Sequence, residues 1–254
     1  MIGTCIAIFK LIAFLCFTPP MMVLQIFILK FNIGNKTWVP QFYNKTLCQI
    51  IGIQILVSGE LPVNGLIVSN HISWKDILVL NALIPVSLIA KHEVGGWPMF
   101  GSLARLQGTI FINRTNKRSM LASLDEMQAR LKNGNTLVLF PEGTTHTGKS
   151  VLPFKSSFFA AAERSSTAVI PVTLIYQTQH GLPLTLRQRP DIAWYGDGTL
   201  APHLWGVLKA GPISVKVIIH APLQSANRKV LAKKAQKQIS ASLAENLHAG
   251  AKIG

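Results

Sequence analysis

The chain opens with an almost uninterrupted apolar stretch, residues 2–31, in which Lys10 and Gln25 are the conspicuous polar positions. Pro19-Pro20 divides it near the middle, and proline breaks the hydrogen-bond ladder of a helix. Each half is shorter than the about 20 residues that a transmembrane helix needs. We therefore predict two short helices, hinged at the prolines, that enter one leaflet as a hairpin. A signal anchor or one kinked span is the alternative.

A cleavable signal peptide does not fit this stretch, because a lysine interrupts the apolar region and no small-x-small cleavage site follows. Lys30, Lys36 and Lys45 come directly after it, which places that side in the cytoplasm. We predict a membrane anchor over residues 1–35 and one catalytic domain over residues 36–254.

The rest of the chain alternates short apolar runs with helical patterns. Strands are expected at 51–57, 66–70, 86–90, 109–113, 136–140, 168–176 and 214–220, and helices at 74–83, 97–106, 118–132, 154–164 and 227–247. Such alternation predicts an α/β fold, with a mixed, mostly parallel sheet flanked by helices. Ligands of such folds bind at loops that follow the carboxyl ends of strands.

Composition narrows the class of partner. Hydrophobic residues make up 49% of the chain, which excludes intrinsic disorder, and the net charge is +15. A hydrophobic and basic chain suggests contact with an anionic bilayer, with nucleic acid as the competing partner. The three cysteines form no CxxC pair, so a disulfide framework or a cysteine zinc site is not expected, and a reducing, cytosol-facing environment fits.

The first chemical candidate is His71 with Asp76, at the junction of a buried strand and a helix. On one helix these residues would point about 140° apart, since each residue turns about 100°. They can meet only if His71 lies in the loop and Asp76 in the first helical turn, about 3 Å away, where the carboxylate orients the imidazole as a base. Ser73-x-x-Asp76 also fits a capping box, in which Asp76 merely closes the helix.

The second candidate is the loop that follows the most apolar strand, where Glu142 is one of only ten acidic residues. Gly143 permits close backbone approach or a positive φ. An ordinary strand-to-turn connection is the alternative reading. The spacing of His71, Asp76, Glu142 and His146 fits no metal motif, so no metal site is predicted.

Two basic residues end apolar strands on the ligand-binding side. We expect Arg114 to clamp a phosphate with its planar fork and Lys91 to reach the same anion. The alternatives are a solvated arginine and a lysine that snorkels to the surface.

Taken together, these segments resemble the glycerolipid acyltransferases, specifically the 1-acylglycerol-3-phosphate acyltransferases of bacterial type. The matching stretches agree in order and spacing over roughly residues 55–175: Asn70-His-x-Ser-Trp-x-Asp76, Lys91-x-Glu93-Val94 with Trp97-Pro98 and Gly101, Gly108-x-Ile-Phe-Ile-x-Arg114, Phe140-Pro-Glu-Gly-Thr144 and Val169-Ile-Pro171-Val172. A weaker similarity at 193–197 and 202–205 is to a subgroup that includes proteins acting on lyso-ornithine lipids. Thr145-His146 departs from the Arg-Ser often found after the third motif.

The resemblance implies a mechanism and a set of roles. His71 removes the proton from the free hydroxyl of a lysolipid, Asp76 stabilises the imidazolium, and the hydroxyl attacks the thioester of acyl-CoA or an acyl carrier protein. Arg114 with Lys91 would hold an acceptor phosphate, while Glu142, Gly143 and Thr144 shape the acceptor pocket. The acyl thioester is a co-substrate, and no cofactor is implied.

The sequence therefore predicts a lysolipid O-acyltransferase at the cytoplasmic face of the inner (plasma) membrane. The favoured acceptor is 1-acylglycerol 3-phosphate, giving phosphatidate, and lyso-ornithine lipid is the alternative. Non-catalytic membrane or nucleic-acid binding is the rival of a different class, but the basic residues are not interleaved with stacking aromatics, so no nucleic-acid partner is predicted. The basic C-terminal helix either lies on the membrane or presents a solvated face.

Overall fold

The structure, a computed structural model, describes residues 2–113, 115–185, 188–196 and 198–251. Its described helices are α1 (Ile2–Phe31), α2 (Trp38–Ile51), α3 (Lys75–Leu83), α4 (Phe100–Leu106), α5 (Lys117–Lys132), α6 (Ala160–Ser165), α7 (Arg189–Ile192), α8 (Leu200–Lys209) and α9 (Arg228–Ala251), with 3-10 turns η1 (His92–Gly96) and η2 (Ser156–Phe159). Its described strands are β1 (Ile53–Ser58), β2 (Gly65–Ser69), β3 (Ser87–Lys91), β4 (Ile110–Ile112), β5 (Thr136–Leu139), β6 (Val169–Gln179), β7 (Leu182–Pro183) and β8 (Ile213–Ile219).

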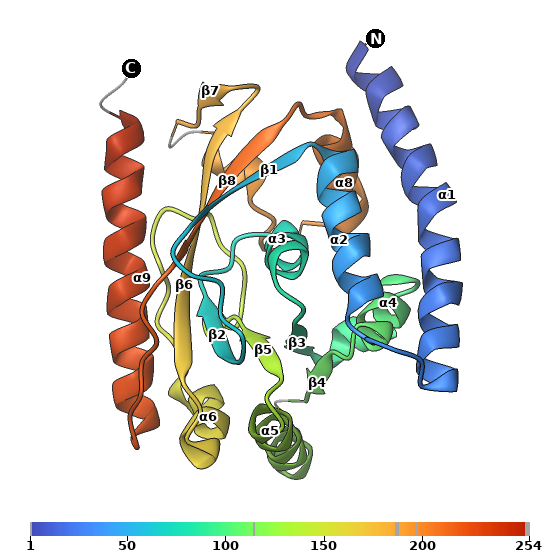
Figure 1. Cartoon of the computed structure of the whole chain (residues 1–254). Coiled ribbons are helices and arrows are strands. Elements are labelled where there is room, and N and C mark those ends of the chain that lie inside the picture. Colours follow the sequence, from blue (N-terminus) through green and yellow to red (C-terminus); the bar gives the residue numbers. More distant parts are fainter. Residues whose placement is uncertain (1, 114, 186–187, 197, 252–254) are drawn as a thin grey trace.

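The strands form one mixed sheet in the order β1-β8-β6-β2-β5-β3-β4, with β7 paired to β6 (Figure 1). The five strands from β6 to β4 are mutually parallel, whereas β8 runs antiparallel to β6 and β1 runs parallel to β8. This arrangement confirms the α/β class and the mostly parallel sheet predicted from the sequence.

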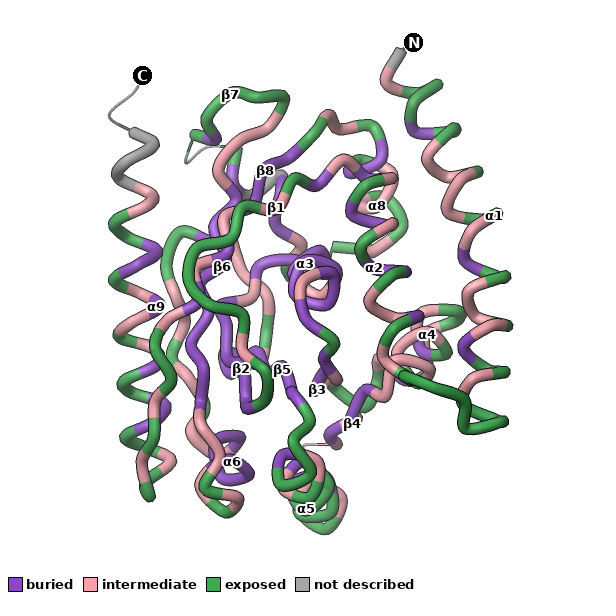
Figure 2. Tube along the Cα trace, viewed as in Figure 1, coloured by how far each residue is buried: buried purple, intermediate pink, exposed green. Residues whose placement is uncertain are grey.

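Alternate residues of the central strands feed two separate cores. Ile67 of β2 packs with α2, α3 and α8 on one face, while its neighbours Leu66 and Val68 pack with α5, α6 and α9 on the other. Strands buried on both faces need apolar side chains toward both layers, which explains why residues 66–68 of β2 and 137–139 of β5 are apolar without interruption. Figure 2 shows both strands buried between the helical layers.

The hinge predicted at Pro19-Pro20 is wrong, because α1 is one continuous helix. Both prolines lie on the exposed side, and the opposite side packs on the domain: Phe14, Phe17 and Met21 contact the core. Continuous packing on one face holds the helix together where two backbone donors are missing. The chain reverses direction after Phe31, between α1 and α2, rather than at the prolines.

The polar residues of α1 bond to the domain along the whole helix. Lys10 donates from Nζ to the carbonyl of Ile51 at 2.7 Å, and Gln25 donates from Nε2 to the carbonyls of Lys36 at 2.9 Å and Leu106 at 3.0 Å. The hydroxyl of Thr18 lies 3.1 Å from that of Tyr43. Lys10, Thr18 and Gln25 therefore lie on the same side of α1 as Phe14, Phe17 and Met21, facing the domain, and most of the exposed side of the helix is apolar.

Helix α2 was not predicted from the sequence. Its buried side chains recur at helical spacing, at Tyr43, Asn44, Leu47, Cys48 and Ile51, so the signal is present in the chain. Gly52 ends the helix with φ of 92°, where its N–H bonds the carbonyl of Cys48 at 2.9 Å. Because α2 continues to this cap, β1 starts at Ile53, two residues after the predicted start of the strand at residue 51.

Helix α9 lies on the side of the sheet opposite α1 (Figure 1). Its lysines at 229, 233, 234 and 237 are exposed. Because the apolar outer face of α1 and the basic face of α9 look away from opposite sides of the sheet, one flat bilayer cannot contact both. The solvated-face alternative for the C-terminal helix fits this arrangement.

Candidate active site

The loop between β2 and α3 is pinned to β6 before it reaches the candidate dyad. The side chain of Asn70, 1% exposed, donates from Nδ2 to the carbonyl of Leu174 at 2.9 Å and accepts the N–H of the same residue at 2.9 Å. A side-chain amide thus continues the strand pairing at the point where β2 ends. This fixes the direction in which the next residue, His71, leaves the sheet.

His71 and Asp76 meet as the loop-and-first-turn arrangement predicts. His71 lies in the loop, Asp76 lies in the first turn of α3, and Nδ1 of the imidazole is 2.9 Å from Oδ2 of the carboxylate. The imidazole side chain is 17% exposed and Asp76 is fully buried. Because Nδ1 is occupied, Nε2 is the nitrogen available to a substrate, and no described residue hydrogen-bonds it.

The capping alternative is realised in part, by the same carboxylate oxygen. Oδ2 of Asp76 accepts the backbone N–H groups of Ile72 at 2.8 Å and Ser73 at 3.0 Å, and the latter bond is one of the two in a capping box. The hydroxyl of Ser73 accepts the N–H of Lys75 at 3.4 Å rather than that of Asp76. Asp76 therefore closes the helix start and orients the imidazole at once. A substitution at Asp76 therefore changes both the start of the helix and the orientation of the imidazole.

Tyr176 is a site residue that the sequence reasoning missed. It lies on β6, one hundred positions from Asp76, and its hydroxyl donates to Oδ1 of that carboxylate at 2.7 Å. Burial, and then the negative charge of Asp76, raise the pKa of Tyr176 well above its usual value, so the phenol stays a donor. No sequence signal links the two, because the contact depends on the packing of α3 against β6.

Glu142 ties the second loop to the first. Its side chain is buried, Oε1 accepts the backbone N–H of His71 at 2.8 Å, and Oε2 accepts that of Leu152 at 2.9 Å. Nε2 of His146 lies 2.6 Å from Oε2, although its N–H is not aligned for a hydrogen bond. Since backbone donors engage both oxygens, we expect Glu142 to shape the site rather than to touch the acceptor.

Two further contacts fix the shape of this second loop. The imidazole of His71 stacks on the ring of Phe140, with centroids 3.9 Å apart and planes 14° apart. Gly143 has φ of 76°, the positive value anticipated from the sequence, which disfavours any side chain there. The structure thus brings His71, Asp76, Glu142 and His146 together at the carboxyl ends of β2 and β5.

The remaining predicted residues are less closely joined to the dyad. Lys91 ends β3 at the same edge of the sheet, with an exposed side chain. Thr144 is exposed and donates from its hydroxyl to the carbonyl of Thr145 at 3.4 Å. Arg114 lies outside the described residues, so its phosphate-clamp role stays a prediction.

A segment from α7 to α8, which we call the strap (residues 189–205), covers the loop between β2 and α3 (residues 70–74), which carries the candidate base and is called the catalytic loop below. The N–H of Trp194 donates to the carbonyl of Ile72 at 2.8 Å. Nε1 of Trp74 donates to Nδ1 of His203 at 3.0 Å. Burial, and then the positive charge of Lys75, lower the pKa of His203 to about 4, so its neutral ring can accept this bond. The weak sequence similarity at 193–197 and 202–205 was the one signal for this segment, although residue 197 is outside the described part.

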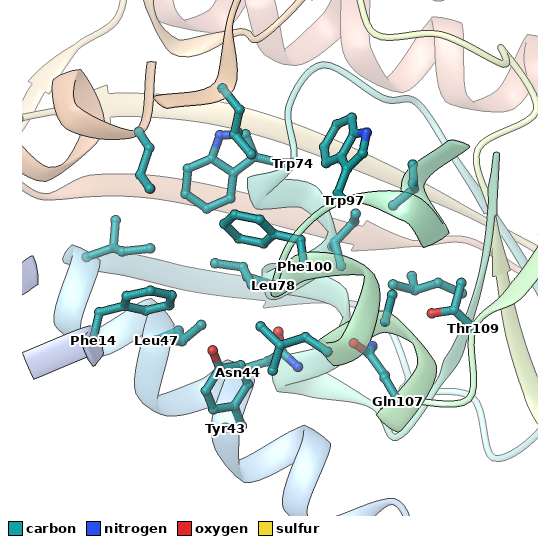
Figure 3. A pocket seen from close by; sticks show the side chains of 18 of the residues that line it. Phe14, Tyr43, Asn44, Leu47, Trp74, Leu78, Trp97, Phe100, Gln107 and Thr109 are labelled. Atoms are coloured by element: carbon teal, nitrogen blue, oxygen red, sulfur yellow. The ribbon is translucent and has the colours of Figure 1, made fainter. Parts of the chain in front are cut away.

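An apolar pocket of about 180 Å³ opens beside the catalytic loop (Figure 3). One water needs about 10–15 Å³ measured in this way, so the space suits a much larger ligand. Its walls come from α1, α2, α3, α4 and α8, and include Phe14, Leu47, Trp74, Trp97 and Phe100. Trp74 belongs to both the catalytic loop and the wall, which connects the pocket to the dyad.

The described residues contain no group of three or more His, Cys, Asp or Glu side chains placed to hold a metal ion. The carboxylate oxygens of Asp76 and Glu142 accept hydrogen bonds from protein donors instead. The arrangement offers one oriented imidazole beside an apolar pocket, which suits proton abstraction from a hydroxyl of an apolar substrate.

Glu142→Gln tests the link between the two loops. An amide has one acceptor oxygen, so the N–H of either His71 or Leu152 loses its partner, at a cost of about 1–3 kcal/mol in stability. We expect a lower melting temperature and about tenfold lower turnover, as for other residues that orient a reactive group. Thermal unfolding and single-substrate kinetics measure both. Glu245→Gln, at an exposed position on α9, is the matched control, and equal behaviour of the two variants would contradict this role.

The sequence was compared with known families and proteins. The family described as "Acyltransferase" matches residues 54–175. The chain is 37% identical to a lyso-ornithine lipid O-acyltransferase of Brucella abortus over 255 residues, covering 96% of each chain. It is 37% identical to a protein of the same name from Rhizobium meliloti, covering 89% of this chain and 82% of that one. A 1-acyl-sn-glycerol-3-phosphate acyltransferase of Neisseria gonorrhoeae is 32% identical, over 77% of this chain and 76% of that one.

The fold is similar to a solved structure. The crystal structure of the 1-acyl-sn-glycerophosphate acyltransferase of Thermotoga maritima superposes with a TM-score of 0.66 at 21% identity, over 96% of this chain and 94% of that one. The coverage includes the N-terminal helix as well as the sheet.

Proposed function

The chain belongs to the acyltransferase family and is an O-acyltransferase of lysolipids, and from that premise we propose that its acceptor is a lyso-ornithine lipid. His71 is the base: Nε2 takes the proton of the free hydroxyl while Asp76 stabilises the resulting imidazolium through Nδ1. The alkoxide-like oxygen attacks the thioester carbonyl of the acyl donor. The imidazolium then returns the proton to the departing thiolate, so no acyl-enzyme is formed. The observation that carries this mechanism is the 2.9 Å contact between Nδ1 and Oδ2.

The choice of acceptor reverses the order expected from the sequence alone. Two relatives named for lyso-ornithine lipid are 37% identical over almost the whole chain, whereas the Neisseria relative named for 1-acylglycerol 3-phosphate is 32% identical over about three quarters of it. The longer alignments extend beyond residue 175, so they include the strap against the catalytic loop. The extent of these alignments supports an acceptor that is recognised by residues of the strap as well as by the motifs shared across the family.

A direct assay tests the acceptor. Purified full-length protein in detergent is supplied with acyl-CoA or acyl carrier protein as the acyl donor, against lyso-ornithine lipid and lysophosphatidate. We expect a higher kcat/KM for lyso-ornithine lipid. Transfer to lysophosphatidate alone would overturn the acceptor while leaving the base mechanism intact, and transfer to neither would overturn the proposed function.

Lysophosphatidate is retained as the second candidate because of Arg114, which matches the arginine of the second motif. If that lipid is the acceptor, Arg114→Ala removes a charge-assisted contact worth about 1.5–3 kcal/mol, or roughly ten- to over a hundredfold in acceptor kcat/KM. The KM of the acyl donor should change far less. Arg118→Ala, an exposed neighbour at the start of α5, is the control. Unchanged lysophosphatidate kinetics in Arg114→Ala would remove the phosphate clamp.

The apolar pocket supports a long acyl chain as part of the substrate. Because Leu11 and Phe14 of α1 line it together with α4 and α8, a chain held there lies between the catalytic loop and the apolar N-terminal helix. We assign Lys91, Gly143 and Thr144 to the rim of the acceptor site, since they end strands or follow them at the same edge as His71. Lipid substrates would reach this pocket from the bilayer.

We further propose that α1 rests in the cytoplasmic leaflet and does not cross the membrane. By length and composition Gly3–Phe31 could span a bilayer. However, Lys10, Thr18 and Gln25 bond to the domain near the start, middle and end of the helix, so the domain accompanies α1 along its length. A spanning helix would leave the domain at one end.

Cys5 provides a reporter for this topology, because it is exposed near the start of α1. In a Cys16→Ser background, we expect a membrane-impermeant maleimide to leave Cys5 unlabelled when added outside intact spheroplasts. Labelling after detergent solubilisation is the positive control, and a Cys5→Ser variant sets the background. Clear labelling from outside would establish a span.

A further inference from the structure

Lys75 is a fully buried ammonium group for which the proposed mechanism has no use. Lysine is almost never fully buried unless it is paired. It stands next to Asp76 at the start of α3, and Nζ donates to the carbonyl of Ile192 in the strap at 2.8 Å. The described part of the chain offers this ammonium no carboxylate in direct contact. Its charge must therefore be stabilised at longer range.

The ring of Tyr176 lies between this charge and the catalytic carboxylate. Nζ of Lys75 is 5.6 Å from the ring centroid, within reach of a cation–π interaction, and the hydroxyl of the same ring donates to Oδ1 of Asp76 at 2.7 Å. Nη1 of Arg189 donates to the backbone carbonyl of Tyr176 at 3.3 Å, which ties α7 to β6 at this residue. Cation, ring and carboxylate thus form one buried row.

Titratable groups on four elements surround Lys75. Asp76 on α3 favours the ammonium, Tyr176 on β6 is neutral, Arg189 on α7 is cationic, and His203 on α8 is neutral because burial and Lys75 lower its pKa to about 4. Burial lowers the pKa of Lys75 to about 8, and the charge of Asp76 opposes that shift. At neutral pH the row therefore holds one positive and one negative charge.

We propose that Lys75 and Tyr176 are positioning residues that set how strongly Asp76 retains a proton on His71, an inference that rests on the proposed base role of His71. A base must be a neutral imidazole before it accepts the substrate proton, and it must release that proton to the thiolate afterwards. An unopposed buried carboxylate would favour the imidazolium too strongly. The positive charge of Lys75 offsets part of this attraction, while the Tyr176 hydroxyl keeps Oδ1 satisfied and the carboxylate aimed.

Lys75 occupies an unspecified position of the first motif, Asn70-His-x-Ser-Trp-x-Asp76, whereas its partners in the row and the strap lie outside the segment that the family matches. Residue 176 lies just beyond the segment 54–175 that the family matches, and Ile192, which holds the ammonium, lies in the strap. The row thus connects the loop of the first motif, residues 70–76, to the strap, which lies outside the matched segment.

The pH profile of the full-length enzyme in detergent tests this inference. Kinetics of wild type, Lys75→Met and Tyr176→Phe are measured from acid to alkaline pH, with whichever lysolipid the wild type accepts. Removing the positive charge of Lys75 makes the imidazolium more favourable, so the acid limb of kcat/KM should move about one unit upward, which is about tenfold in rate on that limb. The higher kcat/KM of wild type relative to Lys75→Met should vanish above about pH 8, where Lys75 itself loses its proton.

Tyr176→Phe removes only the hydroxyl, so it should shift the acid limb in the same direction and lower kcat about tenfold with little change in KM. Lys132→Met, at an exposed position on α5, is the matched control and should leave the profile unchanged. A shifted acid limb supports the inference. An unshifted limb, in either variant, with only a lower melting temperature, overturns it and makes the row purely structural.

Tyr176→Phe keeps the inference testable if Lys75→Met does not fold. Failure of this inference is distinguishable from failure of the proposed base role, which would appear as full activity in His71→Ala, and from failure of the proposed function, which would appear as no transfer to either lysolipid by the wild type.

Discussion

Replacing His71 with alanine should lower turnover about 10²- to 10⁴-fold, the range that a positioned general base contributes. In the proposed mechanism Nε2 takes the proton of the substrate hydroxyl, and without this base the hydroxyl must attack while still protonated. The fold should survive, because the loop retains the bonds of Asn70 to β6 and of Glu142 to the backbone N–H of residue 71. We therefore expect the loss of turnover to come from the missing base and not from unfolding.

The measurement is initial-rate acyl transfer to a saturating lysolipid, with melting temperature and membrane binding recorded for the same preparation. His92→Ala, at an exposed position in η1, is the matched control and should retain full activity. Wild-type rates in a folded His71→Ala protein would refute the base mechanism.

Asp76→Asn should cost about 10²- to 10⁴-fold in turnover, the upper value being that of the same exchange in the His–Asp pair of serine proteases. The amide oxygen can still accept the N–H groups of Ile72 and Ser73, and its NH₂ group can donate to the hydroxyl of Tyr176. Geometry is thus largely retained, while the negative charge that stabilises the imidazolium is lost. We expect the effect mainly in kcat.

Asp125→Asn on α5 is the control, because its side chain is 70% exposed and pairs only with Arg164 at 3.2 Å. Asp76→Ala should lose both activity and stability, since it also leaves the two loop N–H groups unpaired. Equal turnover in Asp76→Asn and wild type would reduce Asp76 to a helix cap.

The membrane-facing helix shows how far a one-dimensional pattern can mislead. Pro19-Pro20 correctly marks two missing backbone donors, but whether a helix breaks there depends on what supports it. Packing of Phe14, Phe17 and Met21 against the core keeps α1 continuous, and no local rule contains that contact. Conversely, Lys10 and Gln25 looked like interruptions of an apolar segment and proved to be the positions that bind the domain.

The site shows the same division. The five-residue spacing of His71 and Asp76 restricts them to one workable geometry, and the structure has it. Glu142 was expected, at a strand end, to shape the acceptor pocket, and the structure adds that it bonds the backbone N–H groups of His71 and Leu152. A carboxylate in a loop carries no local sign of which donors will surround it.

By itself the sequence determined the α/β alternation, the mostly parallel sheet, the loops that carry chemistry and the loop-to-helix geometry of the His–Asp pair. These depend on periods of two and 3.6 residues and on spacings of a few residues, which the chain fixes locally. Only the tertiary structure decided the continuity of α1, the strap and the buried row of Lys75, Tyr176 and Asp76. These depend on contacts between residues far apart in the chain, 117 positions between Lys75 and Ile192 and 129 between Trp74 and His203, and such contacts exist only once the sheet has brought distant segments together.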